Sequence, residues 1–508
     1  MRHVGLLVAA LAASAPALAD APQPLTPQVR TAWHFDRSDL TPDPRIRFGV
    51  LANGMRYAIL PNRTPSGAVS VRLLVKVGAT NGAPGEAHYL EHMAFMGSRG
   101  VPEGARERLS HAEHLREGTG YNAHTGDFDT YYRLDLDRPD RAQLGRMLFL
   151  LRDMASELTL APEAVARARA EILEEVRQRS GPDDRRDRDQ IAFFAPGTRI
   201  ARVSLTGNDG EAGAISAAGL RRLYEAFYTP DRATLIVVGD IDPAWLEAQI
   251  AARFGTWRAT ASEANDVAVT GSRISTADER LEVGMGTSFR ILVAPVGPTW
   301  ATVATVSPLG GGDASAPRDQ GFLQAMGADM LAARVTGHRG GDRPFMDADA
   351  AVEDYYRTAR IARFAVRALD NDWQMAVRVA AHELRCVLEN GFTRDELAIE
   401  LERENERLAA FRGPETSSAI ADRLVEMTGM GVVPTAPARP EDTRAYLAQI
   451  RLEQVNAAFR AAWAAPGRRI HLSHDRPIEG GEAAVAAAWA AAAAPCPIVR
   501  VSAPPAGG

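Results

Sequence analysis

The segment 69–77 alternates between hydrophobic and polar residues over most of its length. Its odd-numbered positions are all aliphatic, whereas Ser70, Arg72 and Lys76 take places between them. Because successive side chains of a strand point to opposite faces, this period predicts a half-buried β-strand. Shortly before it, Asn53-Gly54 separates two short apolar runs, which predicts a hairpin turn.

Several further segments have the spacing of helices or the composition of strands. In the first half, strands are predicted at 129–136 and 233–238, and helices at 87–97, 144–158, 162–178 and 243–254. In the second half, strands are predicted at 289–293 and 361–369, with helices at 372–388 and from a capping box at 393–396 onwards. The order strand, helix, strand, helix, helix occurs in both halves, which indicates a duplication. Strands and helices that mix without strict alternation favour the α+β class.

Composition shifts divide the chain into two large segments with polar flanks. Residues 259–282 are polar and low in large apolar side chains, so we expect a linker there. It would separate a first domain at 45–258 from a second domain at 283–478. Residues 20–44 are Pro-rich and predict an extended lead-in, and residues 479–508 predict an Ala/Pro-rich tail.

The first 19 residues have the three-part plan of a secretory signal peptide. Arg2 and His3 precede an apolar run at 4–13, and Ala17-Leu18-Ala19 forms a small-residue cleavage site. The apolar run is too short to span a bilayer comfortably, so a cleaved signal is favoured over an anchor. No later stretch has the character of a membrane span. We therefore expect a periplasmic or secreted protein.

The composition excludes several classes of protein. Of the 508 residues, 46% are hydrophobic and 24% are charged, which is typical of a globular protein and excludes a disordered or collagen-like chain. A formal net charge of −6 without a basic block gives no reason to expect nucleic acid as a partner. Two cysteines are too few for a disulfide-stapled scaffold. In an exported chain, Cys386 and Cys496 either pair or remain separate thiols, and the sequence leaves both open.

The candidate chemistry is concentrated in the segment His88-Tyr89-Leu90-Glu91-His92. On a helix, His88 and His92 are one turn apart, so both imidazoles project from one face and can share a metal ion. Glu91 directly precedes His92, which is close enough for its carboxylate to reach a water on that metal. The alternative is a pair of ordinary surface histidines. The apolar neighbours of the motif disfavour it, because buried imidazoles need partners.

A catalytic zinc site takes three protein ligands and keeps one position open for water. The two histidines therefore leave one ligand to be found. The predicted helix 162–178 is rich in carboxylates, and Glu171 and Glu175 share one of its faces, whereas Glu174 points elsewhere. Spacing alone leaves Glu171 and Glu175 as rivals.

Several blocks, in order along the chain, resemble peptidase family M16, the zinc metallopeptidases that include pitrilysin, insulinase and the mitochondrial processing peptidase. The pattern H-x-x-E-H is the inverted zincin motif, and residues 87–98 resemble the zinc helix of the family and its following turn. Residues 121–125 and 130–132 resemble its active-site strand. The segment 169–177 resembles its distal-glutamate helix, and 228–230 with 237–242 resemble the end of its first domain.

The resemblance implies a fold and a mechanism. The fold would consist of two homologous domains, the first catalytic and the second not, each a mostly antiparallel sheet with helices packed on one face. One Zn²⁺ per chain would be held by His88, His92 and Glu175, the last glutamate of the distal block, with Glu171 as a supporting carboxylate. The ion would lower the pKa of its bound water, and Glu91 would take a proton from that water and later pass one to the leaving amine. The chain would then be a zinc metalloendopeptidase that hydrolyses peptides or small proteins.

The same resemblance extends to substrate and partners. Asn122 and Ala123 would offer a strand edge to which a peptide substrate adds as a further strand. The chain departs from the family at Ala168, where a glutamate often supports the distal ligand. It most resembles the N-terminal half of a longer bacterial enzyme, which favours a homo- or heterodimer with another M16-type chain. The alternative function is a non-catalytic peptide-binding or scaffolding subunit of such a heterodimer.

Overall fold

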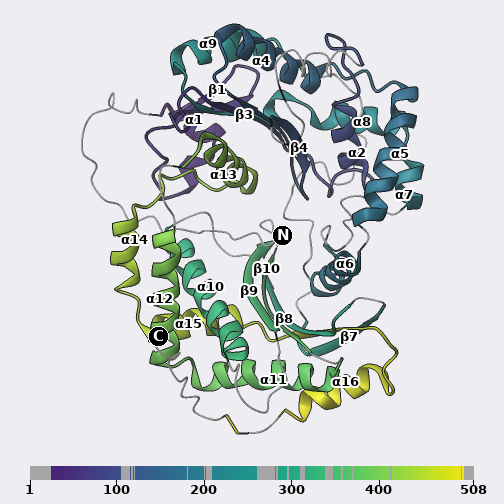
Figure 1. Ribbon diagram of the computed structural model, residues 1–508, viewed down its shortest axis with the longest axis vertical. Helices are drawn as coiled ribbons and strands as arrows, with labels where there is room; N and C mark the ends of the chain where they lie inside the picture. The colour runs from purple at the N-terminus through teal and green to yellow at the C-terminus, as the bar shows by residue number, and fades with distance from the viewer. Residues whose placement is uncertain are drawn as a thin grey trace, which may run out of the picture.

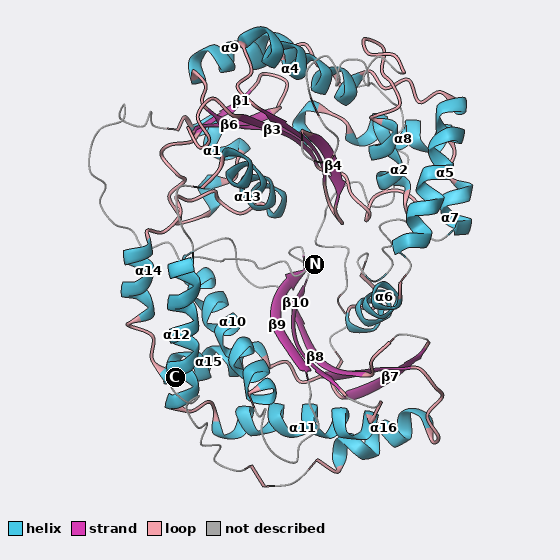
Figure 2. Cartoon of the chain, viewed as in Figure 1, coloured by secondary structure: helices cyan, strands magenta, loops and turns pink. Residues whose placement is uncertain are grey.

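The computed structural model describes residues 25–103, 115, 118, 120–179, 181–198, 201, 209–259, 281, 284–294, 297–308, 315–337, 347–355, 359–368, 371–410, 415–492 and 495–496. The expected signal peptide lies outside these residues, as do most of the expected linker and the end of the expected tail. None of the described helices is long and apolar enough to cross a membrane. The described part contains two β-sheets, one from each half of the chain, with helices around them (Figures 1 and 2).

Each half contributes one sheet, and the strands predicted from hydrophobic patterning overlap with strands of these sheets. The first sheet has the order β1 (Arg47–Val50), β2 (Arg56–Pro61), β6 (Ala233–Gly239), β3 (Val69–Val75), β5 (Thr130–Leu136) and β4 (Tyr121–Thr125). The second sheet has the order β7 (Thr287–Val293), β11 (Arg468–His474), β8 (Trp300–Pro308), β10 (Ala359–Arg367) and β9 (Asp347–Tyr355).

The two sheets have the same topology. The order β2-β6-β3-β5-β4 of the first sheet corresponds strand by strand to β7-β11-β8-β10-β9 of the second, and β1 is an additional edge strand. The pairs β2–β6 and β7–β11 are parallel, and the other pairs of both sheets are antiparallel. This equivalence confirms the prediction of two homologous, mostly antiparallel domains in an α+β protein.

Helices form most of the remaining described chain. Those of the first half are α1 (Pro27–Ala32), α2 (Glu86–Met93), α4 (Arg141–Ser156), α5 (Pro162–Arg179), α6 (Pro182–Phe194), α7 (Asp209–Ala214), α8 (Ala217–Phe227) and α9 (Pro243–Phe254). Those of the second half are α10 (Ser315–Thr336), α11 (Trp373–Asn390), α12 (Arg394–Ala410), α13 (Ser417–Met430), α14 (Pro440–Leu447), α15 (Leu452–Ala462) and α16 (Gly481–Ala490). Short 3₁₀ helices lie at Phe35–Arg37 and Pro230–Arg232.

Local sequence signals set several of these boundaries. Gly54 adopts a φ of 90° in the turn between β1 and β2, a conformation that favours glycine. Gly391, with a φ of 78°, ends α11. Thr393 and Glu396 form the predicted capping box of α12, because each backbone N–H donates to the other side chain, at 2.7 and 3.3 Å.

One face of each sheet is covered by helices of its own half. In the first half, Leu73 of β3 and Val237 of β6 share a buried cluster with Leu148 of α4 and Ile250 of α9. In the second half, Phe364 of β10 lies in the equivalent cluster with side chains of α10, α11 and α15. Apolar burial on these faces is the main force that holds each half together.

The opposite face of the first sheet is covered by a helix from the second half. Helix α13 lies against β3 and β6 (Figure 1), and its Leu424 and Val425 share a buried cluster with Leu74 and Ile236. Every residue of β3 is consequently buried, including Arg72. The prediction of a half-buried strand is therefore wrong, because the periodicity of one strand does not show that a helix distant in sequence covers its polar face.

Polar contacts fix α13 on this face. Nε of Arg72 lies 2.7 Å from a carboxylate oxygen of Asp422 on α13, and Nη1 of Arg72 lies 3.0 Å from Asp135 on β5. The ammonium group of Lys76 donates to the carbonyl of Thr428 at 2.9 Å, in the last turn of α13. A cation at the C-terminus of a helix satisfies free carbonyls and complements the helix dipole. Arg72 and Lys76 of the 69–77 segment thus bind the second half.

A helix of the first half crosses to the second sheet in return. Helix α6 lies against β7, β8 and β11. Phe194 at its C-terminal end is buried with Val306 of β8 and Ile361 of β10. The two halves thus exchange one helix each. The sequence predicted helices on one face of each sheet, and the exchanged helices lie on the other face as well.

The expected lead-in and tail contain helices. Thr26 caps α1 with its side chain, and Trp33 directly after this helix is buried against the first sheet, so the segment around them is not extended. Val485 of α16 is buried in the core of the second half.

Cys386 of α11 and Cys496 form a disulfide, which decides between the two states that the sequence left open.

Candidate metal centre and active site

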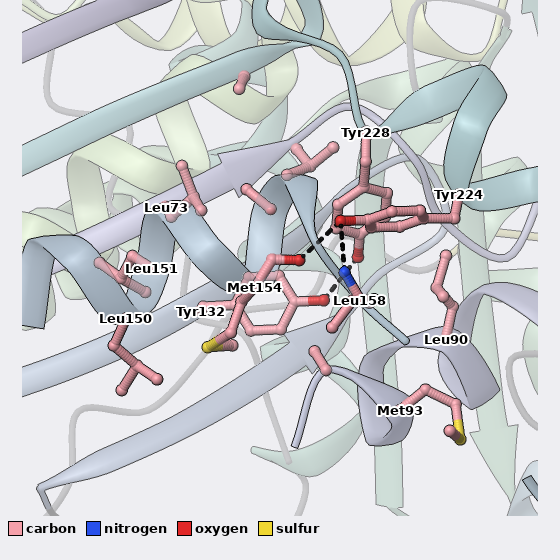
Figure 3. Close-up of a cluster of buried hydrophobic side chains, with 14 of the residues drawn as sticks. Leu73, Leu90, Met93, Tyr132, Leu150, Leu151, Met154, Leu158, Tyr224 and Tyr228 are labelled. Atoms are coloured by element: carbon pink, nitrogen blue, oxygen red, sulfur yellow. Dashed lines mark hydrogen bonds between the residues drawn. The ribbon is translucent and has the colours of Figure 1, made fainter. Parts of the chain in front are cut away.

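Helix α2 is fixed by its apolar side chains. Tyr89, Leu90 and Met93 are buried in the core of the first half, where Leu90 and Met93 are seen in Figure 3. The hydroxyl of Tyr89 also donates to the backbone carbonyl of Val165 on α5. The two histidines and the glutamate of the H-x-x-E-H motif therefore lie on the remaining surface of α2, beside α5 and β4.

His88, His92 and Glu175 meet between α2 and α5. Nε2 of His92 lies 3.2 Å from Oε2 of Glu175, and Nε2 of His88 lies 3.5 Å from the same oxygen. One ligand atom from each of the three residues lies within 4.8 Å of the other two. The side chain of His88 is buried, whereas those of His92 and Glu175 are 24% and 25% exposed. The group is thus partly accessible to solvent.

The chemistry of these donors fits a zinc ion. Two imidazole nitrogens and one carboxylate oxygen make up a ligand set of catalytic zinc sites, which keep a fourth position open. Burial lowers the pKa of His92, but its hydrogen bond with Glu175 and the charges of nearby carboxylates outweigh this effect, so the pKa is raised. The site therefore favours positive charge between the ligands.

The tertiary structure distinguishes the two glutamates that spacing left as rivals. Glu175 faces the histidines, whereas Glu171, one turn earlier on α5, is exposed and lies outside the three-residue group. The charge of Glu171 still contributes to the raised pKa of His92. Ala168, two turns before Glu175 on the same face of α5, is fully buried and supplies no carboxylate.

Glu91 is held by a residue to which the sequence assigned no role. The hydroxyl of Thr125, at the end of β4, donates to Oε2 of Glu91 at 2.5 Å. Thr125 in turn lies 3.2 Å from the hydroxyl of Thr130, which donates to the carbonyl of Val77. Glu91 and both threonines are buried. The sequence contained one signal that could have identified Thr125 as a site residue. Side chains alternate along a strand, so Thr125 lies on the same face of β4 as Ala123.

Tyr132, Tyr224 and Tyr228 lie together among buried side chains of the first half (Figure 3). The hydroxyls of Tyr132 and Tyr228 lie 2.5 Å apart, and the hydroxyl of Tyr224 donates to the carbonyl of Met154 at 3.1 Å. Burial raises the pKa of Tyr132 and Tyr228, and the nearby charge of Glu91 adds to the rise. Both tyrosines are therefore neutral at ordinary pH and form part of the wall behind Glu91.

Strand β4 forms one edge of the first sheet, where it pairs with β5 alone among the described strands. Asn122 is exposed and Ala123 is half-buried. The N–H of Ala123 donates to Oδ1 of Asn122 at 2.9 Å, so this N–H is directed away from β5, along the free edge. A small, mainly apolar cavity lies beside the strand, lined in part by Phe95, Tyr121 and Leu150. This edge has the features of a surface that accepts an additional strand.

Two segments of the chain match known protein families. Residues 57–190, which include the H-x-x-E-H helix and Glu175, match the family described as insulinase (peptidase family M16). Residues 214–303 match the family described as the peptidase M16 inactive domain. Both segments belong to peptidase family M16. The resemblance predicted from the motif blocks is thus confirmed.

Curated relatives of this M16 chain include proteases. It is 32% identical over 207 residues to a probable zinc protease PqqL from Haemophilus influenzae, an alignment that covers 39% of this chain and 22% of that protein. It is 26% identical over 463 residues to the chloroplastic stromal processing peptidase of Pisum sativum, covering 78% of this chain and 35% of that protein. The M16 chain therefore aligns with only about a fifth to a third of these relatives.

Solved structures show the same fold as the M16 chain. The first half of the periplasmic protease PqqL from Escherichia coli superposes with a TM-score of 0.73 at 20% identity, over 89% of this chain and 98% of that one. The structure of the periplasmic protease PqqL from the same organism gives a TM-score of 0.75 at 20% identity, over 92% of this chain and 52% of that one. The two-domain M16 fold predicted from the sequence is confirmed.

Proposed function

We propose that this M16 chain is a zinc-dependent metalloendopeptidase that hydrolyses peptides or small proteins. One observation carries the proposal: two imidazole nitrogens and the carboxylate of Glu175 converge beside Glu91, which is buried and oriented by Thr125. The names of two relatives, a probable zinc protease and a processing peptidase, support the same class of function.

Each residue of the site would have its own role in hydrolysis. His88, His92 and Glu175 would hold one Zn²⁺, with the charge of Glu171 close to them. The ion, when bound, supplies a Lewis acid that polarises the scissile carbonyl and makes the attacking water more acidic. Glu91 accepts the proton of that water and passes one to the leaving amine. Thr125 holds Oε2 of Glu91, so Oε1 is the oxygen that would exchange the proton.

The peptide would bind as an additional strand along the free edge of β4. A carbonyl of the peptide would accept from the N–H of Ala123 in place of the side chain of Asn122. The released amide of Asn122 could then bind the peptide backbone itself. The cavity beside β4, with Phe95 and Tyr121 in its lining, would take an apolar side chain of the substrate.

We further propose that the protein acts outside the cytoplasm and with a second M16-type chain. The sequence of residues 1–19 predicts a signal peptide, and the disulfide between Cys386 and Cys496 suits an oxidising compartment. A relative of the same fold carries the description of a periplasmic protease. The fold of this chain corresponds to 52% of that relative, and in a homo- or heterodimer another M16-type chain would supply a second half like that of the relative.

The variant Glu91→Gln tests the mechanism. We expect the wild-type protein to bind about one zinc ion per chain and to cleave an unstructured peptide, alone or with a copurified M16 partner. Glu91→Gln should keep the zinc, because Glu91 is not among the three ligands, and should lose cleavage by about a hundredfold or more. Full turnover by this variant would exclude Glu91 as the proton acceptor.

A second candidate is a non-catalytic peptide-binding or scaffolding subunit of a heterodimer. Ala168 favours it, because no carboxylate supports Glu175 from that position, and so does the match of residues 214–303 to a domain described as inactive. A wild-type protein that binds a peptide but neither holds zinc nor cleaves, even with its partner, would support this function instead.

A further inference from the structure

One carboxylate joins the helix after Glu175 to the second half of the chain. Asp189 of α6 accepts a hydrogen bond from Nε of Arg290 on β7 at 2.8 Å, and another from the terminal guanidinium nitrogen of the same residue. Its Oδ2 also lies 2.9 Å from Nε2 of His471 on β11. Three hydrogen bonds from two strands of the second sheet thus fix this one side chain of the first half.

The contact has the properties of a defined anchor rather than of a surface ion pair. His471 is fully buried, and the side chain of Asp189 is 17% exposed. Burial alone raises the pKa of Asp189, but the hydrogen bonds from His471 and Arg290 outweigh it, and the pKa lies below its usual value. Bidentate, partly buried contacts between a guanidinium and a carboxylate are among the strong polar interactions of proteins.

Helix α6 follows the metal-ligand helix almost directly. Helix α5 ends at Arg179, one turn after Glu175, and α6 begins at Pro182. Ile172 and Val176 hold α5 in the core of the first half, but the carboxylate of Glu175 lies close to the end of the helix, where helices tend to fray. A firm attachment of α6 therefore restricts the end of α5 from its C-terminal side.

We propose that Asp189 is a positioning residue for Glu175, through which the second half of the chain stabilises the metal centre of the first half. This inference rests on the proposed zinc site. It gives the second half a role in zinc binding that does not require it to touch the ion or the substrate. The loss of the contact would leave Glu175 in place on α5 but less well ordered.

The variant Asp189→Asn tests this role by zinc affinity, measured in competition with a chromophoric chelator. We expect the dissociation constant to rise by about tenfold, the lower end of what residues that orient a ligand contribute. In a Glu175→Gln background, Asp189→Asn should change the zinc affinity little, because the ligand that it positions is gone. A merely structural role would lower the unfolding temperature without this dependence on Glu175.

Asp187→Asn is the matched control, since Asp187 lies on the same helix with a side chain that is 67% exposed. It should leave the zinc affinity unchanged. If Asp189→Asn fails to fold, Arg290→Gln tests the same contact from the second half, where the side chain is 43% exposed. If the wild type binds zinc tightly and neither Asp189→Asn nor Arg290→Gln changes this affinity, the inference is overturned and the proposed zinc site is not. A wild-type protein that binds no zinc would overturn the proposed metal site and the inference with it.

Discussion

Arg72 of β3 and Asp422 of α13 form an ion pair at 2.7 Å across the boundary between the two halves of the chain. The arginine is fully buried and also pairs with Asp135, whereas the side chain of Asp422 is 40% exposed. A charge this deep in the protein depends on its partners, because burial of an unpaired charge is costly. The first sheet thus depends structurally on the second half.

We predict that Arg72→Met lowers the free energy of unfolding by about 2 kcal/mol, because the carboxylate of Asp135 loses its buried partner and keeps only the more exposed Arg133 as an ion-pair partner. Urea unfolding followed by circular dichroism measures the change. Arg63→Met is the control, since Arg63 pairs with Asp240 while 84% exposed, and it should cost less than about 1 kcal/mol. Equal effects of the two substitutions would contradict a special role for the buried pair.

Thr125→Val should slow catalysis without loss of zinc. The substitution keeps the shape of the side chain but removes the donor that holds Glu91. A hydrogen bond to a charged group contributes about 1.5–3 kcal/mol, which corresponds to a decrease in kcat of about tenfold to a hundredfold. Steady-state kinetics and zinc analysis of the same preparation separate the two effects. Thr125→Ser should restore most of the rate, and an unchanged kcat in Thr125→Val would show that Glu91 needs no such support.

Mild acid should destabilise the junction between α6 and the second sheet. Burial lowers the pKa of His471 by more than the hydrogen bond and the charge of Asp189 raise it. The unfolded state therefore binds more protons than the folded state around pH 6. Arg290 and Arg186 also face this imidazole and disfavour its charged form. In the unfolded chain, His471 has the ordinary histidine pKa of about 6.5. The stability that neutral His471 contributes is present above this pH and is lost as the pH falls below it. The lowered pKa of Asp189 acts in the same direction but only in stronger acid.

The measurement is the free energy of unfolding, from urea titrations, of the wild type and of His471→Gln between pH 7.5 and 5. We expect the wild-type curve to fall by up to about 1.4 kcal/mol per pH unit below pH 6.5 relative to the variant, which lacks this titration. Parallel curves would show that His471 does not titrate differently in the folded and unfolded states.

Reduction of the disulfide should weaken the second half. Cys386 and Cys496 are 110 residues apart in sequence, so their bond restricts a long loop of the unfolded chain. We expect Cys386→Ala together with Cys496→Ala to lower the free energy of unfolding by about 2–4 kcal/mol. The wild type should respond to a reductant by a similar amount and the double variant should not. A wild type that is insensitive to full reduction would contradict this contribution.

Local structure in this protein follows closely from local sequence. The strand at 233–238, the helix at 243–254 and the cap at Thr393 all depend on residues near to one another in the chain, and each appears as predicted. The prediction for 69–77 failed only in the environment of the strand. Its polar positions matched the pattern of a solvent-facing side, whereas in the structure that side contacts α13.

The sequence by itself indicated the family and the repeated order of elements. It also determined that His88, Glu91 and His92 lie on one helix, because helical geometry relates residues four apart without any help from the rest of the fold. The family resemblance had already implied Glu175 as the third ligand, and the tertiary structure places it beside the histidines. Only the tertiary structure joined Thr125 to Glu91 and exchanged α6 and α13 between the halves. These relationships depend on how separate elements pack. Packing is decided by the fit of whole surfaces, which no single segment of the chain contains.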